Sequence, residues 1–308
     1  MTGVSGGRTN RDLLTQAGRA AAAAAAGAGV QVRPLETLEQ MTAACVVFDR
    51  VWDIGPDEVS EVQPALLRAL GHGGNYLFGA YRVDTGELVG ASVAFFTEPL
   101  GAAMHSHITG VLGEAAGTGV GGALKWHQRQ WALERGLTRV TWTFDPLIAR
   151  NAYFNLTRLG ARAEIYFVDF YGPLDDGPNR GQPTDRAEVV WDLSSGPAVD
   201  AGRVAREGLH GGAGFDVDAL LHAGTPVRLR VGPSGEPVPG ESPAPGDRAV
   251  LVGIPTDIEA VRRTDPATAL AWRVQLRAAL SSLMVGTAWQ ITGFARSGWY
   301  LLERRKPS

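Results

Sequence analysis

Hydrophobic residues recur along this chain with two periods, and these periods predict a mixture of strands and helices. Short runs rich in β-branched and aromatic residues, such as 137–144 (LTRVTWTF), favour β-strands. Apolar residues spaced three and four apart, as in 36–51, favour amphipathic helices. We expect strands at 30–35, 76–83, 88–96, 102–112, 137–144, 163–171, 186–193, 249–254, 289–294 and 299–303, and helices at 36–51, 62–70, 121–135, 146–159 and 267–283.

This order of elements predicts an α/β (α+β) fold with a mixed, mostly antiparallel sheet flanked by helices. Residues 84–87 (DTGE) join two strand-like runs and predict a hairpin turn. Asp265 directly before Pro266 predicts a capped helix start. The last third of the chain supplies a smaller β-α-β-β unit of its own.

Composition divides the chain into three parts. Residues 1–29 include seven consecutive alanines, which are too weakly apolar for a signal peptide, so we expect a flexible or transiently helical tail. Residues 30–195 form the main domain. Residues 196–308 form a C-terminal extension, whose stretch 232–246 is rich in proline and glycine and predicts a linker.

Length, charge and cysteine count exclude several classes of protein. With 308 residues and 44% hydrophobic content, the chain can bury a substantial core. Its 29 basic and 32 acidic residues give a net charge of −3, without the basic excess of a nucleic-acid binder. No apolar run reaches the ~18 residues of a membrane span, so we expect a cytoplasmic protein. The single cysteine, Cys45, excludes a disulfide framework and predicts a small buried residue.

A glycine-rich turn between a strand and a helix, at residues 117–122 (GTGVGG), carries the strongest chemical signal. Glycines let successive backbone N–H groups point into one concavity, and a helix N-terminus adds a partial positive charge. Both features favour a phosphate or pyrophosphate. The simpler alternative is a tight connection that binds nothing.

Two common phosphate-binding motifs fit this turn poorly. A P-loop continues with Gly-Lys-Ser/Thr, whereas alanine and leucine follow Gly122 here. Residues 117–122 formally match the GxGxxG of dinucleotide-binding enzymes, and Asp145 ends the next strand. However, several strands precede the turn, and Pro146 opens a new helix at once. A nucleotide-dependent oxidoreductase is therefore only an alternative.

The order strand, glycine turn, amphipathic helix, strand, and helix ending in Leu-Gly resembles the GNAT superfamily of acyltransferases over about residues 30–193. The family motif Arg/Gln-x-x-Gly-x-Gly/Ala falls on residues 116–121, and residues 151–160 (NAYFNLTRLG) are similar to its second signature. Residues 105–107 (HSH) and 142–146 (WTFDP) resemble a bacterial branch of predicted acetyltransferases. The resemblance implies an N-acyltransferase that uses acetyl-CoA or another short acyl-CoA, succinyl included, without a metal.

The same resemblance assigns the cofactor-binding residues. The glycine turn would hold the pyrophosphate, and the end of the preceding strand would pair with the pantetheine amides through its backbone. Two asparagines at i and i+4, on one helix face, would border the pantetheine and the thiol. These candidates are Val111, Leu112, Gly117, Thr118, Gly119, Val120, Gly121, Gly122, Asn151 and Asn155.

His105 and His107 are the candidate general bases. They are two residues apart in a strand and therefore project from one face. A histidine with a pKa near neutrality can take a proton from an attacking amine. The alternatives are hydrogen-bonded core histidines and a two-histidine metal pair, for which no third ligand is identifiable.

Two positions depart from the GNAT pattern. Ala116 stands where a basic or amide residue is usual, so phosphate binding would depend more on backbone N–H groups. Leu156 aligns with the tyrosine that often serves as general acid, which leaves Tyr153 and Tyr166 as substitutes. These departures support a second hypothesis, a catalytically degenerate GNAT-fold protein that binds CoA or a metabolite as a sensor or assembly partner.

The sequence does not identify the acceptor or the role of the last helix. We expect a small-molecule amine or amino acid as the acceptor, no nucleic acid or membrane as a partner, and a homodimer as the assembly to test. Arg273 and Arg277 lie one turn apart in the last helix. They are either a solvated basic face or a site for a substrate carboxylate.

Overall fold

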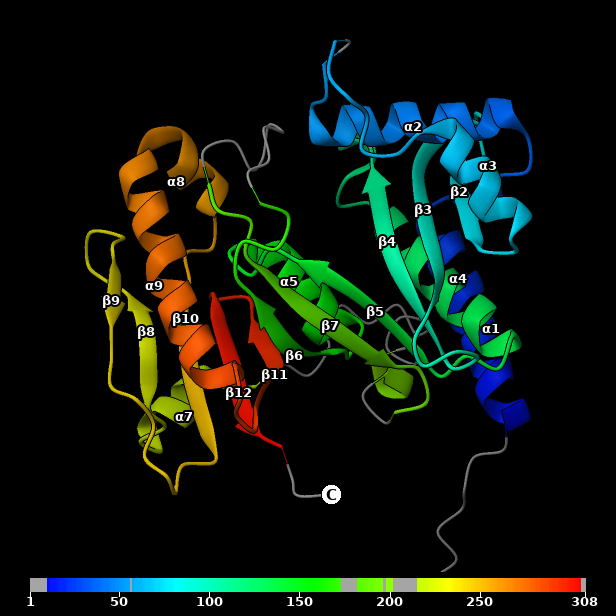
Figure 1. Ribbon diagram of the computed structural model, residues 1–308. Helices are drawn as coiled ribbons and strands as arrows, with labels where there is room; N and C mark the ends of the chain where they lie inside the picture. The colour runs from blue at the N-terminus through cyan, green and yellow to red at the C-terminus, as the bar shows by residue number, and fades with distance from the viewer. Residues whose placement is uncertain (1–9, 56, 173–181, 196–197, 202–214, 306–308) are drawn as a thin grey trace, which may run out of the picture. The chain divides into compact units, whose positions relative to one another are not determined.

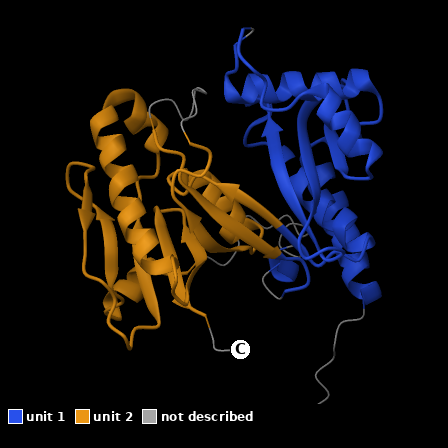
Figure 2. Ribbon diagram, viewed as in Figure 1, with its two compact units in different colours: residues 1–140, 192–210 blue, residues 141–191, 211–308 orange. Residues whose placement is uncertain are grey.

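The chain folds into two compact units in a computed structural model (Figures 1 and 2). Unit 1 comprises residues 1–140 and 192–210, and unit 2 comprises residues 141–191 and 211–308. The sequence predicted a boundary near residue 195. The observed division differs because the segment after residue 140 pairs with the C-terminal third, as Ala163 does with Ile291. The structure describes residues 10–55, 57–172, 182–195, 198–201 and 215–305.

Unit 1 is built on an antiparallel sheet in the order β1–β2–β3–β4. The predicted hairpin joins β2 to β3: the Arg82 N–H donates to the Glu87 carbonyl over 2.9 Å, and Gly86 has a φ of 71°. The strands are β1 (Val30–Pro34), β2 (Tyr76–Arg82), β3 (Leu88–Thr97) and β4 (Ala103–Val111); the helices are α1 (Asn10–Gly27), α2 (Leu38–Trp52), α3 (Pro64–His72) and α4 (Val120–Glu134), and a 3₁₀ turn, η1, spans Gly113–Ala115.

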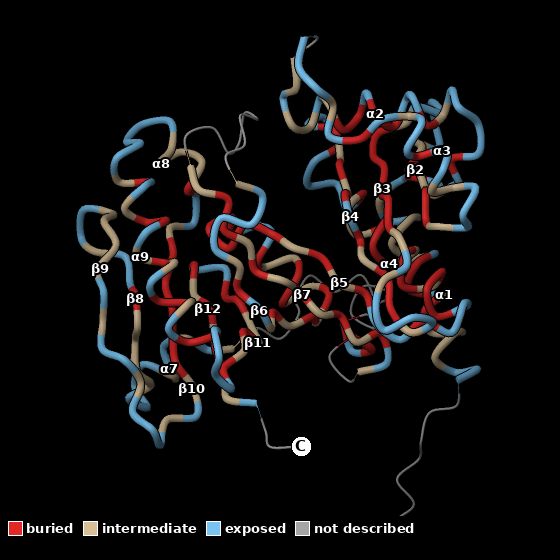
Figure 3. Tube along the Cα trace, in the orientation of Figure 1, coloured by how far each residue is buried: buried red, intermediate tan, exposed pale blue. Residues whose placement is uncertain are grey.

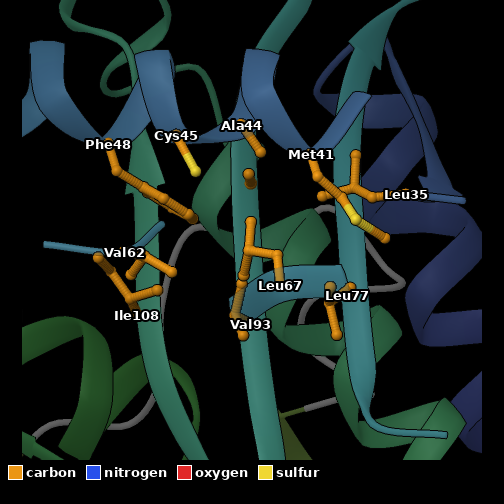
Figure 4. Packing of buried hydrophobic residues seen from close by; sticks show 11 residues of the cluster. Leu35, Met41, Ala44, Cys45, Phe48, Val62, Leu67, Leu77, Val93 and Ile108 are labelled. Carbon is orange, nitrogen blue, oxygen red and sulfur yellow. The ribbon is translucent and has the colours of Figure 1, made fainter. Parts of the chain in front are cut away.

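Helices cover both faces of this sheet, so β3 is buried along most of its length (Figure 3). The helix α2 starts with a capping box between Thr37 and Gln40, which satisfies backbone N–H groups at its first turn. Its apolar side packs with α3 on one face of the sheet (Figure 4). That core consists of Leu35, Met41, Ala44, Cys45, Phe48, Val62, Leu67, Leu77, Ala91, Val93 and Ile108. The prediction of a buried Cys45 is confirmed.

The opposite face of the unit 1 sheet is covered by α4 and α1. Of the two states predicted for the N-terminal tail, flexible or transiently helical, residues 10–27 adopt the helical one and form α1. Its alanines present little bulk, so α1 packs closely on α4 and buries Ala17 and Ala20 completely. Arg129 of α4 fixes this arrangement, since its Nη1 donates to the Gln16 Oε1 atom over 2.6 Å.

The strands of unit 2 lie in the order β5–β7–β6–β11–β12–β10–β8–β9. The pairs β7–β6, β6–β11, β11–β12 and β12–β10 are antiparallel, whereas β10 and β8 are parallel. The mostly antiparallel sheet is as predicted, whereas the C-terminal part contains two strands, β8 and β9, besides the predicted β-α-β-β unit. The strands are β5 (Arg139–Phe144), β6 (Arg162–Phe167), β7 (Arg186–Asp192), β8 (Val227–Val231), β9 (Pro237–Pro239), β10 (Ala249–Gly253), β11 (Trp289–Ala295) and β12 (Trp299–Arg304).

The helices of unit 2 differ from the predicted ones in three places. The helix expected at 146–159 is a short α5 (Ala149–Ala152) followed by a π-helical turn, η2 (Tyr153–Arg158). Two short helices were not predicted, α7 (Val217–His222) and α8 (Ile258–Thr264).

The long helix α9 (Pro266–Met284) begins as predicted, with the Asp265 carboxylate accepting the Thr268 N–H over 3.0 Å. Within the expected linker 232–246, residues 237–239 form β9. Among the described residues, no helix is both long enough and apolar enough to cross a membrane.

Candidate functional site

The turn that leads from β4 into α4 has the backbone of an anion cradle. Gly117 and Gly119 adopt the left-handed region, with φ values of 78° and 99°. Only glycine adopts these angles without strain, which explains its presence at both positions. Thr118 closes the turn, because its hydroxyl donates to the Ala115 carbonyl over 2.7 Å. In this part of the described chain, no side chain caps the N-terminus of α4.

The space beside the glycines differs along this turn: a Cβ atom at Gly119 would lie 3.5 Å from the Ala28 Cβ, and one at Gly121 would lie 3.9 Å from the Val111 Cγ2. A Cβ atom added at Gly117 or at Gly122 would meet nothing within 4 Å. Gly122 has a helical backbone, where glycine costs roughly 0.5–1 kcal/mol relative to alanine, and packing within the chain does not require it. The first turn of α4 also begins with backbone N–H groups that have no partner inside the helix. The turn can therefore accept a phosphate or pyrophosphate at close range.

The strand β4 carries a β-bulge at His107. The pairing with β3 changes register between Val93↔Ile108 and Ala94↔Ser106, so His107 is the extra residue. Ring centroids of His105 and His107 lie 5.4 and 5.8 Å from that of Phe95. The prediction that both histidines share one face is confirmed, and the bulge exposes His107 more than His105.

Both histidines are electrically neutral near pH 7. Burial, together with the charges of His107 and Lys125, lowers the pKa of His105 to about 4. Burial also lowers the pKa of His107. A neutral imidazole can accept a proton, so either histidine is in the form that a general base requires.

A buried polar network lies behind the histidines, on the α4 side of the sheet. The Lys125 Nζ atom donates to the Ser106 Oγ over 2.8 Å and to the Gln128 Oε1 over 3.4 Å. Gln128 in turn donates to Ser92, whose hydroxyl lies 2.8 Å from that of Thr109. Burial lowers the pKa of Lys125 to about 7. The sequence reasoning missed this lysine, although its position on the inward side of an amphipathic helix was a visible signal.

The candidate residues of α5 and η2 belong to unit 2 and differ from one another in exposure. Asn151 is exposed and its backbone N–H donates to the Ile148 carbonyl, whereas Asn155 is buried. The Tyr153 ring lies 4.7 Å from the guanidinium carbon of Arg296. The predicted cofactor residues of the glycine turn, by contrast, belong to unit 1 together with both histidines.

Two of the predicted site residues, Leu112 and Tyr166, form hydrogen bonds within the chain. The Leu112 N–H donates to the Val89 carbonyl, and the Leu112 carbonyl accepts the Ala115 N–H, both over 2.9 Å. Tyr166 is buried, and its hydroxyl donates to Asp185 over 2.6 Å. Burial and this carboxylate raise the pKa of Tyr166 far above its usual value, which disfavours it as a proton donor.

The two arginines of α9 match neither of the alternatives open from sequence. The buried Arg273 binds the Asp145 carboxylate over 2.6 Å, and Arg262 of α8 binds the same carboxylate over 2.8 Å. Arg277 forms a bidentate pair with Asp185 over 2.6 and 2.9 Å. These side chains hold unit 2 together internally.

No family model and no curated protein matches the sequence. Each solved structure below covers about half of this chain. The chain is similar to the ribosomal-protein-S18-alanine N-acetyltransferase from Escherichia coli, with 14% identity over 54% of this chain and 95% of that one, at a TM-score of 0.43. It is also similar to an N-acetyltransferase from Staphylococcus aureus Mu50, with 14% identity, 54% and 99% coverage and a TM-score of 0.44. A third is a GNAT family acetyltransferase from Elizabethkingia anophelis with acetyl-CoA bound, with 15% identity, 53% and 98% coverage and a TM-score of 0.39.

Proposed function

We propose that this chain is an acyl-CoA-dependent N-acyltransferase of the GNAT superfamily. Acetyl is the expected acyl group, with succinyl or another short acyl group as the variant to test, and the acceptor is an amino acid or a small amine. The observation that supports this most is the glycine turn at 117–122, where left-handed glycines and an uncapped helix start leave open space beside backbone N–H groups.

The glycine turn fits the pyrophosphate of an acyl-CoA. Its donors are backbone N–H groups at the start of α4, beginning with Val120, and the helix dipole favours the negative charge. Ala116 carries no positive charge, so backbone N–H groups would bind the pyrophosphate. Val111, at the end of β4, is the residue whose backbone would pair with the pantetheine amides. When bound, the acyl-CoA supplies the acyl group as an activated thioester.

His107 is the better of the two candidate bases. It stands in the bulge, is more exposed than His105, and carries a neutral imidazole near pH 7. In the proposed reaction it takes a proton from the acceptor ammonium, which frees the nitrogen lone pair for attack on the acyl carbon. The backbone N–H near Val111 polarises the carbonyl oxygen, and solvent returns a proton to the leaving sulfur.

A His107→Gln variant tests the assigned base. We expect kcat for acetyl transfer to an amine to fall about 100-fold or more, with the Kd for acetyl-CoA unchanged. The exposed His72 on α3 provides the matched control, since His72→Gln should leave kcat unchanged. A His107→Gln variant with wild-type kcat would contradict the assignment.

One observation favours a second candidate function, a CoA-binding sensor without catalysis. Leu156, which occupies the position of the usual catalytic tyrosine, is buried, and Tyr166 is held by Asp185. Mass spectrometry of reactions with a broad amine panel separates the two functions. Binding of acetyl-CoA without any acylated amine would support the sensor.

A further inference from the structure

Two polar side chains of β4, Ser106 and Thr109, both point to the α4 side of the unit 1 sheet. The Ser106 hydroxyl accepts a hydrogen bond from the Lys125 Nζ atom over 2.8 Å. The Thr109 hydroxyl lies 2.8 Å from that of Ser92, which accepts from the Gln128 amide over 3.4 Å. Residues three apart in a regular strand point to opposite faces. One extra residue between Ser106 and Thr109 therefore accounts for their common direction.

The apolar residues of the same stretch point to the other side of the sheet. Ile108 belongs to the core beneath α2 (Figure 4), and a Cβ atom added at Gly110 would lie 3.1 Å from the Phe48 ring. Ser106 and Ile108 are only two residues apart, yet they point to opposite faces. The extra residue must therefore lie between them, which is the position of His107, where the pairing with β3 changes register.

The hydrogen bonds on the α4 side oppose loss of this bulge. Without it, a slip by one residue would turn either Ser106 or Thr109 towards the apolar core beneath α2. The Lys125 ammonium or the Ser92 hydroxyl would then lose a hydrogen-bond partner at a buried position, where water does not replace it. A regular strand is therefore disfavoured at this place, and His107 keeps its exposed position in the bulge.

We propose that Lys125 is a positioning residue, which fixes the bulge of β4 through Ser106 and thereby holds the His107 imidazole where it takes the proton from the acceptor. The hydrogen bond between Ser92 and Thr109 holds the other side of the bulge. Lys125 acts through the strand and touches neither the acceptor nor the acyl-CoA. This assignment rests on the proposed function, since it concerns the base of that reaction.

Steady-state kinetics of acetyl transfer test the role of Lys125. We expect Lys125→Met to lower kcat about tenfold and to leave the KM for acetyl-CoA unchanged, because the base is displaced while the glycine turn is intact. Ser106→Ala should have the same effect, whereas Ser106→Thr keeps the hydroxyl and should restore most of kcat. Gln130→Met is the matched control on α4, since the Gln130 amide donates to Glu134 of the same helix, and it should leave kcat unchanged.

Hydrogen exchange of the full chain reports on the bulge without any reaction. We expect residues 103–111 to exchange about tenfold faster in Lys125→Met and in Ser106→Ala than in the wild type, and residues 76–82 of β2 to exchange at the wild-type rate. Unchanged exchange of 103–111 overturns the proposal. Wild-type kcat in Lys125→Met, or equal kcat in Ser106→Ala and Ser106→Thr, also overturns it. A wild type that transfers no acetyl group ends the proposed function instead, and the exchange measurement still decides whether Lys125 fixes the bulge.

Discussion

The two units bury charge in different ways. In unit 1, the buried Lys125 donates hydrogen bonds to the neutral side chains of Ser106 and Gln128. In unit 2, the buried Asp145 binds two arginines, Arg262 and Arg273. The first arrangement lowers the pKa of a cation towards neutrality, while the second stabilises an anion.

The direction of the pKa shifts follows from these partners. Burial lowers the pKa of Lys125 to about 7, because an ammonium loses hydration that hydroxyl and amide oxygens replace only in part. Burial alone would raise the pKa of Asp145, but the charge and hydrogen bond of Arg273, together with Arg262, lower it to about 2. The two arginines therefore keep Asp145 charged in the fold of unit 2, whereas burial makes the Lys125 charge in unit 1 sensitive to pH near neutrality.

The largest expected effect comes from breaking the pair in unit 2. Asp145→Asn leaves the buried Arg273 and the partly buried Arg262 without their shared anion, so we expect unfolding free energy to fall by about 3–5 kcal/mol. Because the folded pKa lies below the ordinary value of 3.8, the wild-type contribution is complete above pH 3.8 and is lost as pH falls through about 2. Urea unfolding monitored by hydrogen exchange of unit 2 peptides measures the loss.

The exposed pair between Arg50 and Glu114 provides the control for that experiment. Its side chains are 54% and 47% exposed, so solvent screens the interaction. Glu114→Gln should leave the urea midpoint unchanged. An unchanged midpoint for Asp145→Asn would contradict the difference between the two units.

The second expected effect concerns Lys125 and lies in a different pH range, between pH 7 and 10.5. Between pH 7 and 10.5 the unfolded chain binds the proton that the folded chain has released, so wild-type stability rises with pH. We expect the stability advantage of Lys125→Met over the wild type to shrink by roughly 2–4 kcal/mol between pH 6 and pH 10.

Lysine NMR provides a direct check on this shift. The chain contains two lysines, Lys125 and Lys306, so ¹³C-lysine labelling gives two signals, and Lys125→Met assigns them. A Lys125 signal that titrates at the ordinary value near 10.4 would contradict the account of unit 1.

The smallest of these stability effects concerns Arg277, whose side chain is 31% exposed. Arg277→Met removes a bidentate partner, but the Tyr166 hydroxyl and the Asp169 N–H still donate to Asp185. We expect a loss of about 1–2 kcal/mol in unfolding free energy. If Arg277→Met lost as much unfolding free energy as Asp145→Asn, the exposure of the arginine side chain would not determine the size of the loss.

The local features of the fold could be predicted from sequence, because they depend on neighbouring residues. The hairpin at Gly86, the cap at Asp265 and the glycine turn before α4 all follow from backbone preferences within a few positions. The shared face of His105 and His107 could also be predicted, although the bulge that exposes His107 could not.

The features that escaped prediction depend on contacts between distant segments. The alanine-rich segment 10–27 forms a packed rather than a transient helix because α4 offers it a surface, which alanine content alone does not reveal. The division near residue 141 follows from the pairing of β6 with β11. Likewise, Asp145 and Arg273 are 128 positions apart, so their ion pair has no local signature.

The central claim is that the glycine turn binds the pyrophosphate of an acyl-CoA, and calorimetric titration with acetyl-CoA tests it most directly. Gly122→Asp adds a carboxylate where a side chain meets open space, and Gly122→Asn adds the same shape without charge. The account expects wild-type binding, a loss of about tenfold or more in Gly122→Asp, and a much smaller loss in Gly122→Asn, with folding intact because an acidic residue suits a helix start. Absence of binding to the wild type, or equal affinity in Gly122→Asp, would contradict it.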